Sequence, residues 1–272
     1  MILTAHLFSV LHEKLIELLN SLQPDDWQRP TLAKQWTVKD IAAHLLDTSI
    51  RALAARDKHI VRPATSIESY QDLVVFLNQL NAGWVDAFKR VSPQVLTDFL
   101  IEAGQQQAIY IESLDMTADA PVSVAWAGEE RSAMWFHVAR EYTERWHHQQ
   151  QIREAVGKQG IMTGELFYPC IDTFLCGLPY TYRHTVAPTG TVIQVRIETE
   201  IGGNWYLAYK GENWQLSKTP QPQPAAFVSM PPDTAWKLFT KGITPKEAER
   251  QVTFSGDDQL AKVVLNLVAV MA

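Results

Sequence analysis

Helical periodicity over the first 157 residues constrains the fold of this chain most strongly. Leucines recur at helical spacing through residues 3–22, and similar apolar faces mark several later stretches. These stretches cover residues 38–59, 66–91, 93–114 and 131–156, and short loops join them. Long helices joined by short connections pack as bundles. The sequence therefore predicts an all-α bundle in its N-terminal part.

Local signals predict where these helices begin and end. Thr37 followed by Asp40 forms a capping-box variant at the start of one helix. Ser66 is the expected cap of the next helix, after a loop that begins at Arg62. Ser92 followed by proline predicts the start of a further helix, and Gly157 predicts the end of the last one.

The last of these helices carries a stripe of metal-capable side chains. Its members are His137, Glu141, Glu144 and His148. Steps of three and four residues keep them within about 40° of one line along a helix. A Glu and a His at i and i+4 can hold one cation, because their side chains lie one turn apart. A solvated polar face, opposite an apolar face that contains Trp146, explains the pattern equally well.

A third ligand would have to come from another helix, and His44 is the candidate. It lies at the edge of an apolar face, with Asp40 and Asp47 nearby on the same helix. A histidine in that position can point into a crevice between helices. It can also be an ordinary hydrogen-bonded histidine. The spacing leaves both interpretations open.

One further spacing in the stripe bears on the number of metal ions. Glu144 and His147 form a Glu-x-x-His pair, which di-iron bundles contain twice. Only one such pair occurs here, so a mononuclear centre is favoured. His147 lies about 100° from His148 on a helix and is expected to face away from the same ion. His137 and Glu141 are expected either to line the site or to be solvated.

Composition excludes several classes of function. The net charge is −6 and no run of lysine or arginine occurs, which argues against a nucleic-acid partner. No apolar stretch approaches 18 residues, so no membrane partner is expected. The N-terminal residues lack a basic leader and a cleavage signal, which predicts a cytoplasmic protein. Cys170 and Cys176 are expected to be reduced thiols.

The pattern changes after Gly160. Residues 192–199 alternate in polarity, and turn residues then separate several further short strands. The strands are expected at 205–209, 215–217, 225–229 and 252–255, with helices at 232–240 and 259–271. Strands followed by helices predict an α+β domain.

Two sequence segments resemble the signature segments of the DinB-like superfamily. They are Trp-Thr-Val-Lys-Asp-Ile-Ala-Ala-His-Leu at 36–45 and Arg-Glu-Tyr-Thr-Glu-Arg-Trp-His-His-Gln-Gln-Gln-Ile-Arg at 140–153. The most similar branch is the mycothiol-dependent maleylpyruvate isomerase type. The resemblance implies a four-helix bundle that binds one divalent metal through His44, Glu144 and His148. Zinc is the expected ion, with nickel or iron as alternatives.

The order of elements near the C-terminus resembles the sterol-carrier-like domain that follows the bundle in these isomerases. The expected domains are therefore a metal-binding bundle at 1–158 and a small α+β, sterol-carrier-like domain at 180–272. The isomerases also have an essential arginine in the second domain, and no residue here can be matched to it.

The resemblance implies a metal-dependent enzyme that uses a low-molecular-weight thiol as cofactor or co-substrate. Such an enzyme is a maleylpyruvate-isomerase-like isomerase or a thiol S-transferase, and its substrate is a small electrophile. An anionic thiol or diacid needs a cation near the metal, and Arg51, Arg140 and Arg145 are the candidates. The alternatives are another mononuclear metalloenzyme, hydrolase or oxygenase, and a non-enzymatic lipid-carrier or binding protein.

Overall fold

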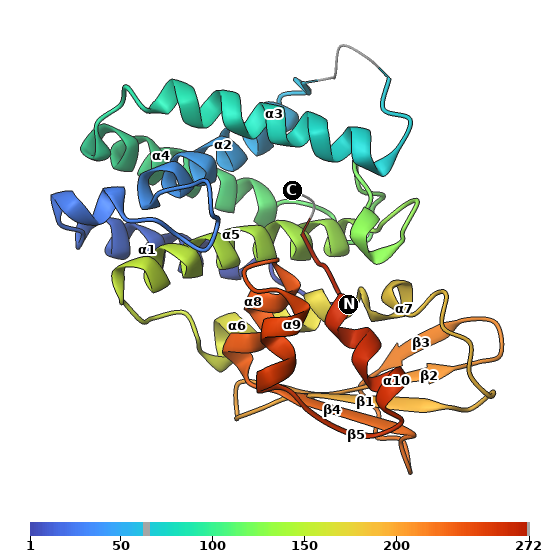
Figure 1. Cartoon of the computed structure of the whole chain (residues 1–272). Helices are drawn as coiled ribbons and strands as arrows, with labels where there is room; N and C mark the ends of the chain where they lie inside the picture. The colour runs from blue at the N-terminus through green and yellow to red at the C-terminus, as the bar shows by residue number, and fades with distance from the viewer. Residues whose placement is uncertain (62–65, 271–272) are drawn as a thin grey trace. The chain divides into compact units, whose positions relative to one another are not determined.

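The chain forms two compact units in a computed structural model that describes residues 1–61 and 66–270 (Figure 1). The bundle unit comprises Thr4–Asp115 and Glu144–Ile161. The sheet unit comprises Met1–Leu3, Met116–Thr143 and Met162–Val270. The division falls inside one helix, α5 (Met134–Val156), which contributes its first part to the sheet unit. The expected domain limits, 1–158 and 180–272, stay a prediction.

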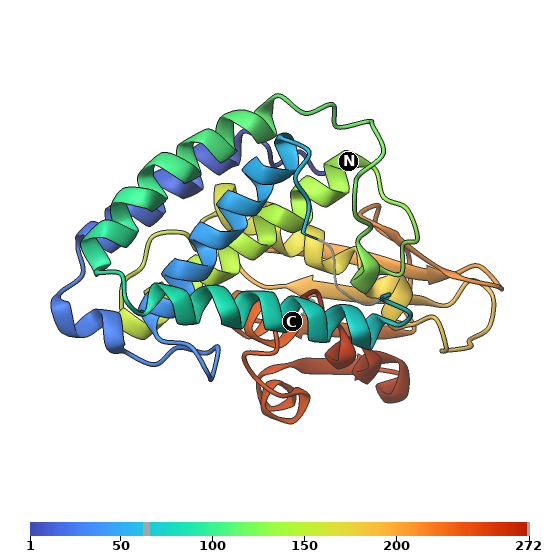
Figure 2. The ribbon, with the colours of Figure 1, turned by 90° about the horizontal axis from the view of Figure 1, so that it is seen from above.

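The bundle unit confirms the predicted helical bundle. Its helices are α1 (Leu7–Asn20), α2 (Val38–Arg56), α3 (Tyr70–Phe88), α4 (Pro93–Glu112) and the second part of α5, with a short 3-10 helix at Pro24–Gln28. α4 packs against both α1 and α2, and α3 packs against α2. Figures 1 and 2 show α1 and α4 side by side. The core between them is aliphatic and includes Leu15, Leu19, Val38, Ile41, Leu45, Leu96, Leu100 and Ile152.

Helix starts follow local hydrogen bonding. Thr37 and Asp40 form the predicted capping box, in which the Asp40 backbone N–H donates to Thr37 Oγ1 at 3.3 Å. Ser92 caps α4 as predicted. The predicted cap at Ser66 is wrong, because Ser69 caps α3 by accepting from the Asp72 backbone N–H at 3.1 Å. Residues 62–65 of the predicted loop lie outside the described residues.

The sheet unit confirms the predicted α+β part. Its strands are β1 (Val192–Ile197), β2 (Gly203–Tyr209), β3 (Trp214–Ser217), β4 (Ala226–Met230) and β5 (Thr253–Gly256). They form one sheet in the order β3-β2-β1-β4-β5. Neighbouring strands are antiparallel except β1 and β4, which are parallel. The chain therefore crosses from β3 at one edge to β4 beside β1.

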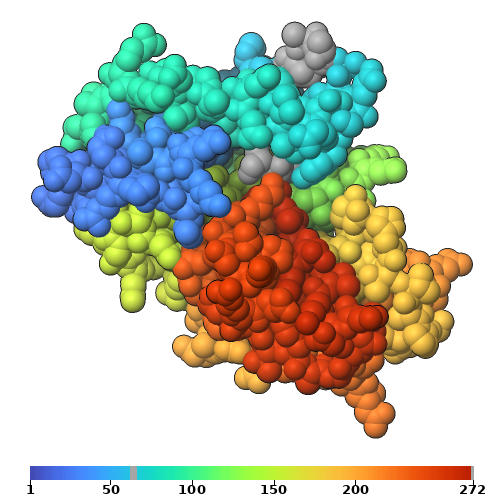
Figure 3. Space-filling model, viewed as in Figure 1, coloured from blue at the N-terminus to red at the C-terminus, as the bar shows by residue number. Residues whose placement is uncertain are grey.

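Five further α-helices follow the bundle among the described residues of this unit. They are α6 (Gly164–Leu175), α7 (Leu178–Thr181), α8 (Pro232–Phe239) and α9 (Pro245–Ala248), with α10 (Asp258–Lys262) after β5. Figure 3 shows the residues of α8, α9 and α10, in orange and red, as one continuous surface.

Two features of this unit differ from the expectation. α6 was not predicted, because its sequence is apolar with Pro169 inside it, and proline normally breaks a helix interior. The final helix is shorter than the predicted 259–271: α10 ends at Lys262 and a 3-10 turn follows over Val263–Asn266. Residue 271 lies outside the described residues. No helix among residues 1–61 and 66–270 is long and apolar enough to cross a membrane.

Candidate metal centre

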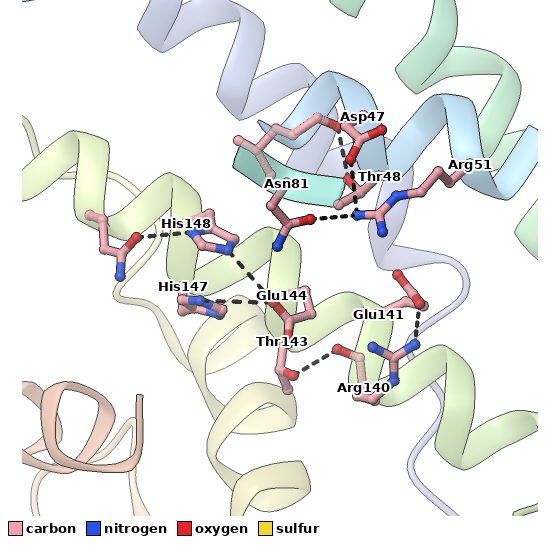
Figure 4. A network of polar contacts seen from close by, with 12 residues as sticks. Asp47, Thr48, Arg51, Asn81, Arg140, Glu141, Thr143, Glu144, His147 and His148 are labelled. Atoms are coloured by element: carbon pink, nitrogen blue, oxygen red, sulfur yellow. Dashed lines mark hydrogen bonds and ion pairs between the residues drawn. The ribbon is translucent and has the colours of Figure 1, made fainter. Parts of the chain in front are cut away.

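Three potential ligands converge on the part of α5 that belongs to the bundle unit. Atoms of Glu144, His147 and His148 that can bind a metal lie within 4.8 Å of one another (Figure 4). His148 Nε2 lies 3.6 Å and His147 Nε2 4.0 Å from Glu144 Oε2. Glu144 is one turn before both histidines, so its carboxylate faces the Nε2 atoms of both rings. The expectation that His147 faces away is wrong.

The protonation of His148 can be derived from its contacts. Its Nδ1 lies 2.9 Å from Gln151 Oε1, and an amide oxygen only accepts hydrogen bonds. Burial, followed by the charge of His147, lowers the pKa of His148 to about 3, so the ring is neutral at pH 7. The single proton is therefore on Nδ1. Nε2 presents its lone pair toward Glu144.

Two electron-pair donors thus face each other across a gap that no hydrogen bond closes. The 3.6 Å between His148 Nε2 and Glu144 Oε2 is too long for a hydrogen bond. Two ligand atoms bound at 2.0–2.2 Å to one tetrahedral ion lie roughly 3.4 Å apart. The observed gap is close to that separation, so a cation would satisfy both atoms.

His44 approaches this cluster from α2. Its ring centroid lies 4.7 Å from that of His148 in an edge-on arrangement, and 4.8 Å from that of Trp36. Burial, followed by the charges of His148 and Arg51, holds the pKa of His44 well below its usual value. Its Nδ1 is buried and has no hydrogen-bond partner among the described residues. Such an atom costs free energy unless a ligand satisfies it.

The donor set fits a divalent metal of the zinc, nickel or iron type. Imidazole nitrogen and carboxylate oxygen are ligands of all three. His44 lies against the cluster but is not one of the three residues whose ligand atoms lie within 4.8 Å of one another. His147 is therefore an additional candidate beside the set His44, Glu144 and His148.

The three arginines singled out from the sequence have different surroundings. Arg145 is buried and donates to Ser49 Oγ at 2.7 Å, which ties α5 to α2. Arg51 on α2 forms an ion pair with Asp47 at 3.1 Å. Arg140 pairs with its neighbour in sequence, Glu141.

The first part of α5 belongs to the sheet unit. It carries His137, Arg140 and Glu141, whose expected role beside a metal stays a prediction. Burial, followed by the charge of Arg140, lowers the pKa of His137 to about 4.

Sequence reasoning missed two residues of the site. Gln151 follows His148 by three residues, a spacing that could have indicated a contact on the same face of the helix. Asn81 of α3 is buried and accepts a hydrogen bond from Arg51 at 3.3 Å. No signal in the sequence around Asn81 points to that contact.

The fold and the cluster define a helical bundle with a candidate metal centre, followed by an α+β sheet. Residues 8–153 match the model of the mycothiol maleylpyruvate isomerase N-terminal domain. This match covers more than half of the chain, so the protein belongs to that family.

Comparison with solved structures supports the same fold. The structure titled "Crystal structure of the mycothiol-dependent maleylpyruvate isomerase" matches with a TM-score of 0.57 and 11% identity, over 92% of this chain and 91% of that chain. A mutant of the same enzyme matches with a TM-score of 0.56 and 10% identity over the same shares. At such identities the likeness shows the fold alone.

A partial match was also found to a structure titled "UbiJ-SCP2 Ubiquinone synthesis protein". It covers 40% of this chain and 97% of that chain, with 14% identity and a TM-score of 0.26. A search of curated proteins found no match.

Proposed function

We propose that the protein is a metal-dependent enzyme that uses a low-molecular-weight thiol on a small electrophilic substrate. It acts as an isomerase of the maleylpyruvate type or as a thiol S-transferase. The observation that carries the proposal is the lone pair of His148 Nε2 facing the Glu144 carboxylate across 3.6 Å. Family membership and the names of the structural relatives support mycothiol and maleylpyruvate as the first thiol and substrate to test.

In this proposal His44, Glu144 and His148 hold the ion, which is zinc, nickel or iron. Three protein ligands leave a coordination position open, as reactive metal sites do. His147 either supplies a fourth ligand or orients Glu144, to which its Nε2 lies 4.0 Å away. A divalent ion at this site would lower the pKa of a bound thiol, so that the thiolate forms at neutral pH.

The protein's own residues prepare the site for that chemistry. Gln151 keeps the His148 proton on Nδ1, which leaves Nε2 available. Burial keeps His44 and His148 neutral, so protons compete poorly for the ligand atoms at pH 7. Trp36 packs its ring against His44 and excludes water from that side.

Isomerase and transferase differ in the fate of the thiol. In an isomerase the thiolate adds to a carbon–carbon double bond, the resulting single bond rotates, and the thiolate leaves unchanged. In a transferase the thiol stays in the product. The stoichiometry of thiol consumption therefore separates the two.

The donor set also supports a second candidate, a metal-bound water that hydrolyses a substrate. A hydrolase needs the metal but no thiol. A non-enzymatic carrier would need neither for its function.

The test is metal analysis of the purified protein, followed by assays with maleylpyruvate and mycothiol. We expect about one divalent ion per chain, and turnover that requires both the thiol and the metal. His44→Ala and Glu144→Gln should abolish metal binding and activity. His59→Ala is the matched control, because His59 follows the same helix but is exposed.

Two other outcomes would count against the thiol-dependent enzyme. Metal-dependent turnover of an ester or amide without a thiol would favour the hydrolase. A protein that binds no divalent ion under any condition would refute the proposed function.

A further inference from the structure

Arg51 is held beside the candidate metal centre by two side chains that contact the same nitrogen. Its Nη2 lies 3.1 Å from Asp47 Oδ2 and donates to Asn81 Oδ1 at 3.3 Å (Figure 4). Asp47 is on α2 and Asn81 on α3, so the guanidinium is fixed from two helices. A fixed guanidinium loses less side-chain entropy when it binds a ligand.

Most of the donors of this guanidinium are not used by the protein. An arginine has five N–H donors. Among the described residues, Arg51 Nη1 and Nε donate no hydrogen bond. The Arg51 side chain is 32% exposed and its Nε is buried, so a dissolved ligand would bind the guanidinium through Nη1. Asp47 and Asn81 therefore hold the arginine without occupying its whole fork.

Arg51 also lies on the same face of α2 as His44. Residues seven apart are two turns apart on one side of a helix, about 10 Å along its axis. Side chains on a helix point back toward its N-terminus. The contact of Arg51 with Asp47, one turn back, shows that the guanidinium has this direction. It therefore reaches toward His44 and the cluster.

The charges around the cluster favour an anionic ligand. Arg51 and Arg145 balance Asp47 and Glu144 in formal charge, and imidazoles bind a metal ion in their neutral form. A divalent ion would leave this group of side chains with an excess of two positive charges. A thiolate on the ion neutralises one of them, and a carboxylate on the same ligand or on the substrate would neutralise the other.

We propose that Arg51, positioned by Asp47 and Asn81, binds the carboxylate of the ligand that occupies the metal centre. This inference rests on the proposed function and adds to it the residue that selects an acidic ligand, whether a carboxylate-bearing thiol or an acidic electrophile. A guanidinium and a carboxylate form charge-assisted hydrogen bonds in a fork geometry.

The test uses the full chain loaded with Co²⁺, whose thiolate complexes absorb light. The probes are 3-mercaptopropionate and 3-mercapto-1-propanol, which differ only in the group at the end away from sulfur. We expect the wild-type protein to bind the acidic thiol about tenfold more tightly or more, the range of a hydrogen bond to a charged group. Arg51→Gln should remove this preference without changing the dissociation constant of the alcohol.

Arg56→Gln is the matched control. Arg56 is on the same helix and its loss changes the charge equally, but its fork is paired with Asp57 and is exposed. It should keep the preference. If Arg56→Gln reduces the preference as much as Arg51→Gln, the general field of the protein is responsible and the proposal is overturned.

A second substitution at Arg51 distinguishes a loss of ligand binding from a loss of structure. Arg51→Lys keeps the charge without the fork and should retain cobalt with a reduced preference. Loss of cobalt from both Arg51 variants would assign Arg51 to the structure of the centre and overturn the proposal.

A final arm identifies the source of the carboxylate. If the carboxylate comes from the substrate, maleate, which has no thiol, should compete with 3-mercapto-1-propanol for the wild type. It should not compete for Arg51→Gln. If the wild type binds both thiols with the same dissociation constant and maleate does not compete, the role of Arg51 is overturned while the proposed function stands. Failure to bind cobalt sinks the proposed function as well.

Discussion

The hydrogen bond between His148 and Gln151 gives the sharpest test of the candidate metal centre. Gln151 Oε1 accepts from His148 Nδ1 at 2.9 Å in a buried environment. Gln151→Met removes the acceptor while it preserves the length of the side chain. We expect the affinity for zinc to fall while the helix content stays the same.

The magnitude follows from the state of the ring. Without metal, His148 can move its proton to Nε2 or rotate, so the loss of Gln151 costs little. With metal on Nε2, the proton must stay on Nδ1, where it has lost its partner. A buried donor without an acceptor costs about 1–3 kcal/mol, which corresponds to a fall in affinity of roughly 10–100-fold.

The assay is competition for Zn²⁺ with a chelating indicator, and circular dichroism reports the helix content. Gln150→Met is the control, since Gln150 is the neighbouring buried glutamine and its Oε1 has no hydrogen-bond partner among the described residues. Equal zinc affinities of the Gln151 and Gln150 variants would refute the derived proton position and the role of Nε2 as a ligand.

Three further predictions test the ligand set, the half-buried His137 of the sheet unit and the start of α2. His148→Ala should lose the metal without loss of helix content, and an unchanged metal stoichiometry would rule out His148 as a ligand. His147→Ala should weaken metal binding less than His148→Ala if His147 is not a ligand. Because the pKa of folded His137 is about 4 and that of an unfolded histidine about 6.5, the unfolded state takes up the proton first, so stability should fall between pH 6.5 and 4. His137→Gln should reduce that fall by at most about 3 kcal/mol, and equal pH slopes of the wild type and the variant in urea unfolding would contradict it. Thr37→Ala removes the acceptor for the Asp40 N–H and should lower the free energy of unfolding by about 1 kcal/mol, and no change in the urea midpoint would contradict the capping role.

Much of the bundle could be predicted because its signals are local. Caps at Thr37 and Ser92 act on backbone groups three residues away, and their spacing is visible in the sequence. The cap of α3 is the exception. Both Ser66 and Ser69 can cap a helix, and only the path of the backbone decides that Ser69 does so. α6 was missed for the opposite reason: packing stabilises a helix that its own proline disfavours.

The sheet shows a similar limit. Alternating polarity located its strands, but the parallel pairing of β1 with β4 joins residues about 30 positions apart in the chain. Pairing partners depend on which edges meet during folding, and the pattern within one strand does not specify this.

For the candidate metal centre, the sequence by itself determined that Glu144 and His148 share one face of a helix, since the period of the helix fixes that relation. It also placed Arg51 two turns beyond His44. Only the tertiary structure decided that His44 packs edge-on against His148, that Asn81 holds Arg51, and that burial makes the histidines neutral. The physical reason is that desolvation and contacts between helices arise from residues distant in the chain, whereas helical spacing acts within two turns.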